Sequence, residues 1–235
     1  MFIRHITKRL GNFIIGLSEF GKDASTLDLR GDRAIEWAWV VANIPNNPGK
    51  VLDFGCGDAS LSLIAAVKGG DVIGLDQQQV HLPYRIDNLN IQKGDMLNFD
   101  FGKMQFDVII NCSSIEHVGL AGRYGSTDAQ DGDLIVMERM RHILKSPEGI
   151  MILVVPVGKD SVFPPLHRVY GTHRLNLLLR GFYVIKKEFW SKGAGLNIWT
   201  KVSEEEAIDV KPSESFYALG LFILKSGHTV LQNAK

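Results

Sequence analysis

The stretch Lys50-Val-Leu-Asp-Phe-Gly-Cys-Gly-Asp-Ala-Ser60, followed by Val72-Ile-Gly-Leu-Asp76, decides the fold. It begins with an apolar run that is typical of a buried parallel strand. Gly55 and Gly57 then allow a sharp turn and a close approach of the backbone to a ligand. An apolar helix and a second strand that ends in Asp76 follow. This order predicts a βαβ unit of the dinucleotide-binding type, in which Asp76 accepts hydrogen bonds from ribose hydroxyls.

Two residues of this unit separate one cofactor class from another. A nicotinamide or flavin fingerprint has a third glycine where this chain has Ser60, and Asp53 precedes the turn. A carboxylate there repels a pyrophosphate but suits a cation or an amino group. S-adenosylmethionine carries an amino group, a sulfonium and a ribose, and no phosphate. The run Asp53-Phe-Gly-Cys-Gly resembles the first motif of the class I S-adenosylmethionine-dependent methyltransferases.

This resemblance covers about Lys50 to Leu224 and implies both a fold and a cofactor site. The implied fold is one Rossmann-like three-layer α/β/α sandwich, with a seven-stranded, mostly parallel sheet whose last strand is antiparallel. The implied cofactor is S-adenosylmethionine. Its methionine end, its ribose and its adenine would be bound by residues after four of the strands: Asp53, Gly55, Cys56, Gly57, Asp76, Gln77, Asp95, Met96 and Asn111.

The chain is expected to have an N-terminal segment (residues 1–28), the methyltransferase domain (29–225) and a frayed tail (226–235). Basic and apolar residues alternate over Met1 to Phe20. This pattern predicts an amphipathic helix packed on the domain, and the alternative is a peripheral contact with a membrane or a partner.

Composition excludes some other classes of function. The 235 residues suit one domain, and the formal net charge of zero argues against a long nucleic acid as substrate. No apolar run reaches the roughly 18 residues of a membrane span. Cys56 and Cys112 lack the spacing of a metal site, so we expect two reduced thiols, no metal and a cytoplasmic protein.

A helix over Leu29 to Ile44 precedes the first strand, with Asp32 as a plausible N-cap. It carries the cluster Arg33, Glu36, Trp37 and Trp39. Two interpretations remain open at this point. The cluster roofs the cofactor cleft, or it is an ordinary aromatic packing face with one ion pair.

The run Cys112-Ser-Ser-Ile-Glu-His-Val-Gly119 follows the predicted fourth strand, at the sheet edge where working groups of such folds lie. Glu116 and His117 are therefore candidate catalytic residues, with His117 as a general base that takes the proton of a hydroxyl. The alternative is that His117 braces the following helix. The run lacks the Asn/Asp-Pro-Pro-aromatic motif of amino-methylating nucleic acid enzymes, which favours O-methylation.

Two further polar clusters are candidates for the substrate side. The glycine-rich loop of residues 120–133 holds Arg123 and Tyr124, and long loops of this kind are often functional. The run Leu166-His-Arg-Val-Tyr-Gly171 holds Arg168 and Tyr170, together with His167 as an alternative base.

Residues 115–171 also resemble a bacterial group of small methyltransferases associated with surface-polysaccharide or sugar modification. The prediction is therefore an S-adenosylmethionine-dependent O-methyltransferase that acts on a small-molecule or glycan acceptor. Two alternatives remain: a non-catalytic S-adenosylmethionine-binding regulatory or assembly protein, and a nicotinamide-dependent oxidoreductase.

Overall fold

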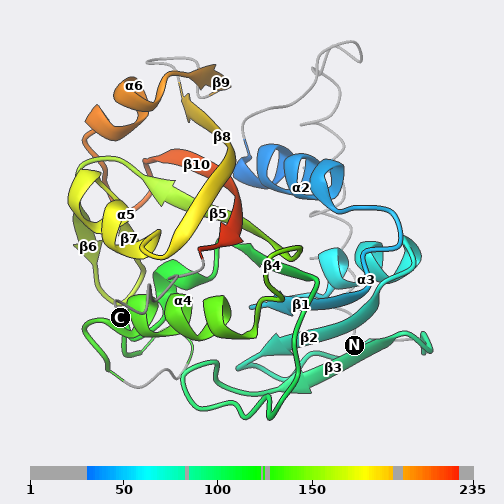
Figure 1. Cartoon of the computed structure of the whole chain (residues 1–235). Coiled ribbons are helices and arrows are strands. Elements are labelled where there is room, and N and C mark those ends of the chain that lie inside the picture. The colour runs from blue at the N-terminus through cyan, green and yellow to red at the C-terminus, as the bar shows by residue number, and fades with distance from the viewer. Residues whose placement is uncertain (1–30, 83–84, 123, 125–127, 193–197, 228–235) are drawn as a thin grey trace, which may run out of the picture.

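The computed structural model describes residues 31–82, 85–122, 124, 128–192 and 198–227. An eight-stranded sheet forms the centre of this part of the chain, in the order β3-β2-β1-β4-β5-β10-β8-β9 (Figure 1). Strands β1 to β5 pair in parallel, β10 is antiparallel to both β5 and β8, and β9 is antiparallel to β8. The strands are β1 (Lys50–Phe54), β2 (Asp71–Asp76), β3 (Leu89–Lys93), β4 (Val108–Cys112), β5 (Ile150–Val157), β8 (Phe182–Lys192), β9 (Trp199–Val202) and β10 (Ala218–Ser226).

Helices cover both faces of the sheet and give three layers (Figure 1). One face carries α2 (Asp32–Asn43) and α3 (Ser60–Val67). The other carries α4 (Gly132–Ile143), α5 (Thr172–Leu178) and α6 (Glu204–Asp209). A 3₁₀ turn, η1 (Ile115–His117), follows β4, and the short strands β6 (Ser161–Phe163) and β7 (His167–Val169) form a separate pair.

The core consists of two apolar clusters, one on each face of the sheet. Along β1, Leu52 and Phe54 belong to the cluster under α4, whereas Val51 belongs to the cluster under α2 and α3. Alternation of this kind follows from the period of two in a strand. Because both faces are covered, the central strands are apolar throughout, as the sequence pattern predicted.

The predicted fold class is confirmed, and two details, the number of strands and the N-cap of α2, are corrected. The sheet has eight strands rather than seven, because the segment after β8 returns as β9 along the edge. The N-cap of α2 is Gly31 rather than Asp32, which is the first helical residue. Residues 204–209 form α6, which begins with a capping box between Ser203 and Glu206. The predicted N-terminal segment (1–28) lies outside the described residues, as does most of the predicted tail (226–235).

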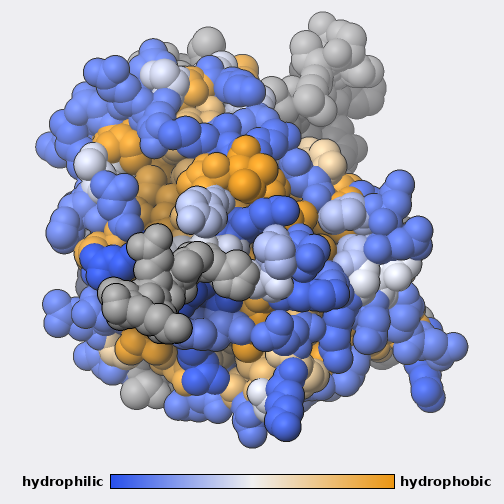
Figure 2. Space-filling view, viewed as in Figure 1, coloured by the Kyte–Doolittle hydropathy of each residue, from blue (hydrophilic) through white to orange (hydrophobic). Residues whose placement is uncertain are grey.

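Figure 2 shows a largely hydrophilic face with a patch of hydrophobic side chains in the region of β8. Strand β9 pairs only with Phe189–Lys192, so the first half of β8 lies at the edge of the sheet. Tyr183, Val184 and Ile185 are exposed there. Lys186 and Lys187 follow them, and lysines at an edge strand oppose its pairing with other chains.

The turn after η1 is expected to be sensitive to a single methyl group. Gly119 has φ +74°, and a Cβ there would clash with the carbonyl oxygen of Ala129. Gly102 also has positive φ, at +55°, but a Cβ there meets nothing within 4 Å. We expect Gly102→Ala to lower the free energy of unfolding by about 1 kcal/mol through backbone strain, and Gly119→Ala by at least about 2 kcal/mol.

Urea unfolding of the two variants measures this difference. Equal losses in both would contradict the close packing of Gly119 against Ala129.

Candidate active site

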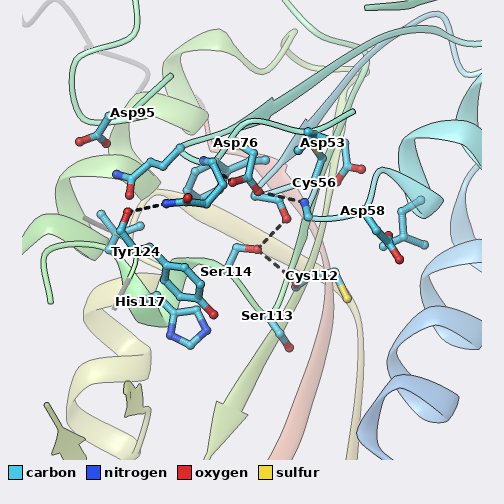
Figure 3. A pocket seen from close by; sticks show the side chains of 18 of the residues that line it. Asp53, Cys56, Asp58, Asp76, Asp95, Cys112, Ser113, Ser114, His117 and Tyr124 are labelled. Atoms are coloured by element: carbon cyan, nitrogen blue, oxygen red, sulfur yellow. Dashed lines mark hydrogen bonds between the residues drawn. The ribbon is translucent and has the colours of Figure 1, made fainter. Parts of the chain in front are cut away.

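A pocket of about 510 Å³ opens at the carboxyl ends of β1, β2 and β4 (Figure 3). Crevices at this edge of an open parallel sheet are where ligands of such folds bind, and the volume lies in the usual range for small-molecule sites. The residues that line it are Arg33, Trp37, Asp53, Phe54, Gly55, Cys56, Gly57, Asp58, Leu61, Asp76, Gln77, Gln78, Gln79, Val80, Asp95, Cys112, Ser113, Ser114, His117, Val118 and Tyr124.

Both glycines of the turn after β1 have positive φ, but their surroundings differ. Gly55 has φ +67°, its N–H donates to the Leu75 carbonyl at 2.8 Å, and a Cβ there would clash with the Ser114 side chain. Gly57 has φ +57°, and a Cβ there would meet no atom within 4 Å. The backbone at Gly57 therefore borders open space in the pocket.

Asp76 is held in place by the turn that it faces. Its Oδ2 accepts from the Gly57 N–H at 2.9 Å, and its Oδ1 accepts from the Gln78 N–H at 2.8 Å. A carboxylate has about four acceptor sites, so each oxygen retains capacity for a further donor. Gln77 and Gln78 line the pocket beside it.

The other residues predicted for the adenosine end divide into two kinds. Asp95 lines the pocket and also accepts from the Leu97 N–H at 2.9 Å, so it is both a turn aspartate and a pocket residue. Met96 is 1% exposed in the core. Asn111 is fully buried, and its Oδ1 accepts from the Ile115 N–H at 3.3 Å. The structure thus places Met96 and Asn111 behind the pocket lining rather than in it.

Asp53 and Cys56 lie deep in the pocket wall (Figure 3). The Ser62 hydroxyl donates to Asp53 Oδ2 at 2.6 Å, and burial raises the pKa of Asp53 to about 6. Burial and the neighbouring Asp53 also raise the pKa of the Cys56 thiol. A thiol of raised pKa is a poor nucleophile, so Cys56 contributes shape rather than reactivity.

His117 lies on the opposite side of the pocket, against the Tyr124 ring at a centroid distance of 5.2 Å (Figure 3). Its Nδ1 is 2.6 Å from the Leu166 carbonyl oxygen, which can only accept, so Nδ1 carries a proton. In the neutral ring Nε2 is then the basic nitrogen, and it lies 3.8 Å from Oε1 of the buried Glu116. The Leu166 carbonyl thus fixes the tautomer of the neutral ring, and the base role predicted for His117 stays a prediction.

The second polar cluster is not part of the pocket lining, and this corrects the predicted roles of three residues. His167 is 6% exposed and packs between the rings of Phe163 and Tyr217. Arg168 is 2% exposed and donates to backbone carbonyls, including that of Val118 at 2.5 Å. Arg123, which was predicted for the substrate side in the loop of residues 120–133, lies outside the described residues.

Tyr170 is fully buried, and its hydroxyl donates to Asp133 Oδ2 at 3.1 Å. Arg174 donates to both oxygens of the same carboxylate, at 2.6 and 3.0 Å. Arg168 contacts Asp133 at 3.8 Å and also holds the carbonyl of Gln130 at 3.1 Å. Asp133 is therefore the centre of a buried network that fixes both ends of the loop carrying Tyr124.

Several pocket residues had no separate signal in the sequence. Ser113 and Ser114 occur in a run in which only the following glutamate and histidine stood out. Arg33 and Trp37 line the pocket, which supports the roof interpretation of the helix before β1, whereas Trp39 packs in the core. Glu36 is buried and accepts hydrogen bonds from Arg33 and Ser113.

Among the described residues, no group of three or more His, Cys, Asp or Glu side chains is placed to hold a metal ion. None of the helices in this part of the chain is long and apolar enough to cross a membrane.

A family model covers residues 66–209 and carries the description "Caenorhabditis protein of unknown function, DUF268". The chain belongs to this family. The description assigns no activity, so the narrower likeness to sugar-modifying methyltransferases stays a prediction. A search of curated protein sequences found no match.

Solved structures of methyltransferases share the fold of this DUF268 chain. The 1,6-didemethyltoxoflavin-N1-methyltransferase of Burkholderia thailandensis, solved with S-adenosylhomocysteine, is 15% identical with a TM-score of 0.54, over 96% of this chain and 90% of its own. The CcbJ methyltransferase of Streptomyces caelestis is 12% identical with a TM-score of 0.53, over 84% and 91%. The N-methyltransferase NodS of Bradyrhizobium japonicum, also with S-adenosylhomocysteine, is 13% identical with a TM-score of 0.50, over 77% and 79%.

Burial of Asp53 predicts a pH dependence of stability. Its pKa is about 6 in the folded protein against an ordinary value of 3.8. The folded state therefore binds the proton more tightly, so this group lowers the free energy of unfolding as the pH rises from about 4 to about 6. Asp53→Asn removes this contribution. The free energy of unfolding of the variant, relative to that of the unmodified protein, should therefore increase by about 3 kcal/mol between pH 4 and pH 7.

Urea unfolding at a series of pH values measures the gain. Asp71→Asn, at the exposed start of β2, is the control. A difference between Asp53→Asn and the unmodified protein that is constant with pH would contradict the burial of this carboxylate.

Proposed function

We propose that this protein is an S-adenosylmethionine-dependent methyltransferase. The observation that supports this most is the pairing of Asp76 with the Gly57 turn at the edge of a 510 Å³ pocket. The residues present fit the cofactor, since a fixed carboxylate with remaining acceptor capacity suits a ribose diol. A Cβ at Gly57 would meet no atom within 4 Å, so open space borders the turn there.

Each part of the pocket has a proposed role in holding the cofactor. Asp76 accepts hydrogen bonds from the ribose hydroxyls, with Gln77 beside it. Asp95 and the apolar Val80 border the adenine. Gly55, Gly57 and the buried Asp53 shape the methionine end. When bound, S-adenosylmethionine supplies an electrophilic methyl group on a sulfonium.

The acceptor is proposed to be an oxygen of a small molecule or glycan, and His117 supports that choice. His117 lines the pocket, and its imidazole is held through Nδ1 by the Leu166 carbonyl. It would take the proton that an acceptor hydroxyl loses, with Glu116 stabilising the imidazolium. Two of the fold neighbours are named as N-methyltransferases, so the fold itself does not select oxygen.

Asp76→Ala is expected to weaken binding of S-adenosylhomocysteine, the product form of the cofactor, roughly 10- to 100-fold, because hydrogen bonds to a charged group are lost. Asp76→Asn keeps one acceptor oxygen and should lie between. Calorimetric titration measures the affinities, with Asp71→Ala at the other end of β2 as the matched control. Unchanged affinity in Asp76→Ala would count against the ribose assignment.

His117→Gln is expected to leave affinity for S-adenosylhomocysteine unchanged and to lower methyl transfer by about 10²- to 10⁴-fold, the usual contribution of a general base. Transfer of labelled methyl from S-adenosylmethionine to a panel of sugar acceptors measures the rate. His142→Gln changes a histidine whose side chain is 63% exposed on α4 and serves as the control. A drop of less than about threefold would refute the base role while leaving methyl transfer by alignment intact.

A further inference from the structure

The charges around the pocket are unevenly distributed. Four aspartates line it, at positions 53, 58, 76 and 95. Arg33 is the single arginine or lysine among its described lining residues. A ligand group with negative charge is therefore repelled by most of the pocket and attracted to one place in it.

Arg33 is held there by a buried partner. Its Nη1 donates to Glu36 Oε2 at 2.8 Å, while its side chain remains 56% exposed. Glu36 is 1% exposed, and its Oε1 accepts from the Ser113 hydroxyl, which follows β4. The bond to Glu36 uses one of the five N–H donors of the guanidinium. Since a carboxylate is costly to bury without partners, this arrangement fixes Arg33 at the pocket.

Sheet order gives the position of Arg33 along the pocket. Asp95 follows β3 and Asp76 follows β2, whereas Ser113 follows β4 on the other side of β1. The link through Glu36 thus places Arg33 at the β4 end, across the glycine turn from the proposed ribose site. A ligand whose ribose lies on Asp76 reaches this end with its amino-acid portion.

We propose that Arg33 binds the α-carboxylate at the methionine end of the cofactor, and that Glu36 is a positioning residue that holds the guanidinium toward it. This assignment rests on the proposed function. An arginine and a carboxylate match in charge and in fork geometry. The guanidinium uses one N–H group on Glu36, and its other N–H groups remain for the carboxylate.

Calorimetric titration with two probes tests the assignment. S-adenosylhomocysteine carries the amino-acid carboxylate, whereas 5′-methylthioadenosine has the same adenosine and thioether without it. Arg33→Leu should weaken binding of S-adenosylhomocysteine roughly 10- to 100-fold. It should change the affinity for 5′-methylthioadenosine less than about twofold. Glu36→Gln should reproduce the same selectivity with a smaller loss, roughly threefold to tenfold.

Two further variants serve as controls. Arg33→Leu leaves the buried Glu36 without this partner, so the double variant Arg33→Leu/Glu36→Gln removes both charges together and should show the same selective loss. Arg180→Leu removes an exposed arginine after α5, away from the pocket, and should change neither affinity.

The outcomes separate this inference from the proposed function. If Arg33→Leu weakens binding of both probes to the same extent, or changes the affinity of neither, the carboxylate assignment is overturned. Unchanged affinity for both would indicate that Arg33 binds the acceptor instead. If the unmodified protein binds neither probe, the proposed cofactor itself is wrong and the assignment falls with it.

Discussion

The close approach of two turns, one after β1 and one after β4, is the constraint on which the site depends. Strand β1 pairs in parallel with β2 on one side and with β4 on the other, so all three strands end at the same edge of the sheet. Gly55 lies against the Ser114 side chain, and the Ser114 hydroxyl donates to the Gly55 carbonyl at 3.2 Å. A Cβ at residue 55 would clash with the Ser114 side chain and force these two turns apart.

Local patterns were enough to predict the parallel half of the fold and its glycine turn. Buried parallel strands are apolar on both faces, and the turn needs positive φ. Each can therefore be recognised from a short local pattern, an apolar run or a pair of glycines. Asp76 and His117 were predicted from their place in the chain, because Asp76 ends β2 and His117 lies in the turn that follows β4. Strand β9 has no such local pattern, because its pairing depends on how the segment after β8 returns along the sheet.

The parts that the sequence could not give depend on contacts between distant residues. Arg168 and Tyr170 look like exposed polar candidates in the sequence. In the interior, however, they bond to Asp133 and to backbone carbonyls that are 37 to 50 positions away. Conversely, the role of Ser113 follows from Glu36, which is 77 positions away in the sequence. Burial of a polar side chain is decided by the partner that it finds, and a single sequence does not show the partner.

Buried carboxylates surround the pocket and link its stability to its chemistry. Asp53, Glu36, Glu116 and Asp133 are each at most 2% exposed. Burial raises the pKa values of Asp53 and Glu36, which is a cost to folding near neutral pH. Such costs are often found at binding sites, where they fix the positions of the groups that meet a ligand. In this chain Glu36 holds Arg33, and Glu116 lies beside His117, at the same pocket.

Calorimetric titration of the unmodified protein with S-adenosylhomocysteine, beside reduced nicotinamide cofactor, tests the central claim most directly. Binding of S-adenosylhomocysteine in the micromolar range, with no binding of the nicotinamide cofactor, is the predicted result. Tight binding of the nicotinamide cofactor instead, or of neither compound, would contradict the assignment of the crevice between β1, β2 and β4.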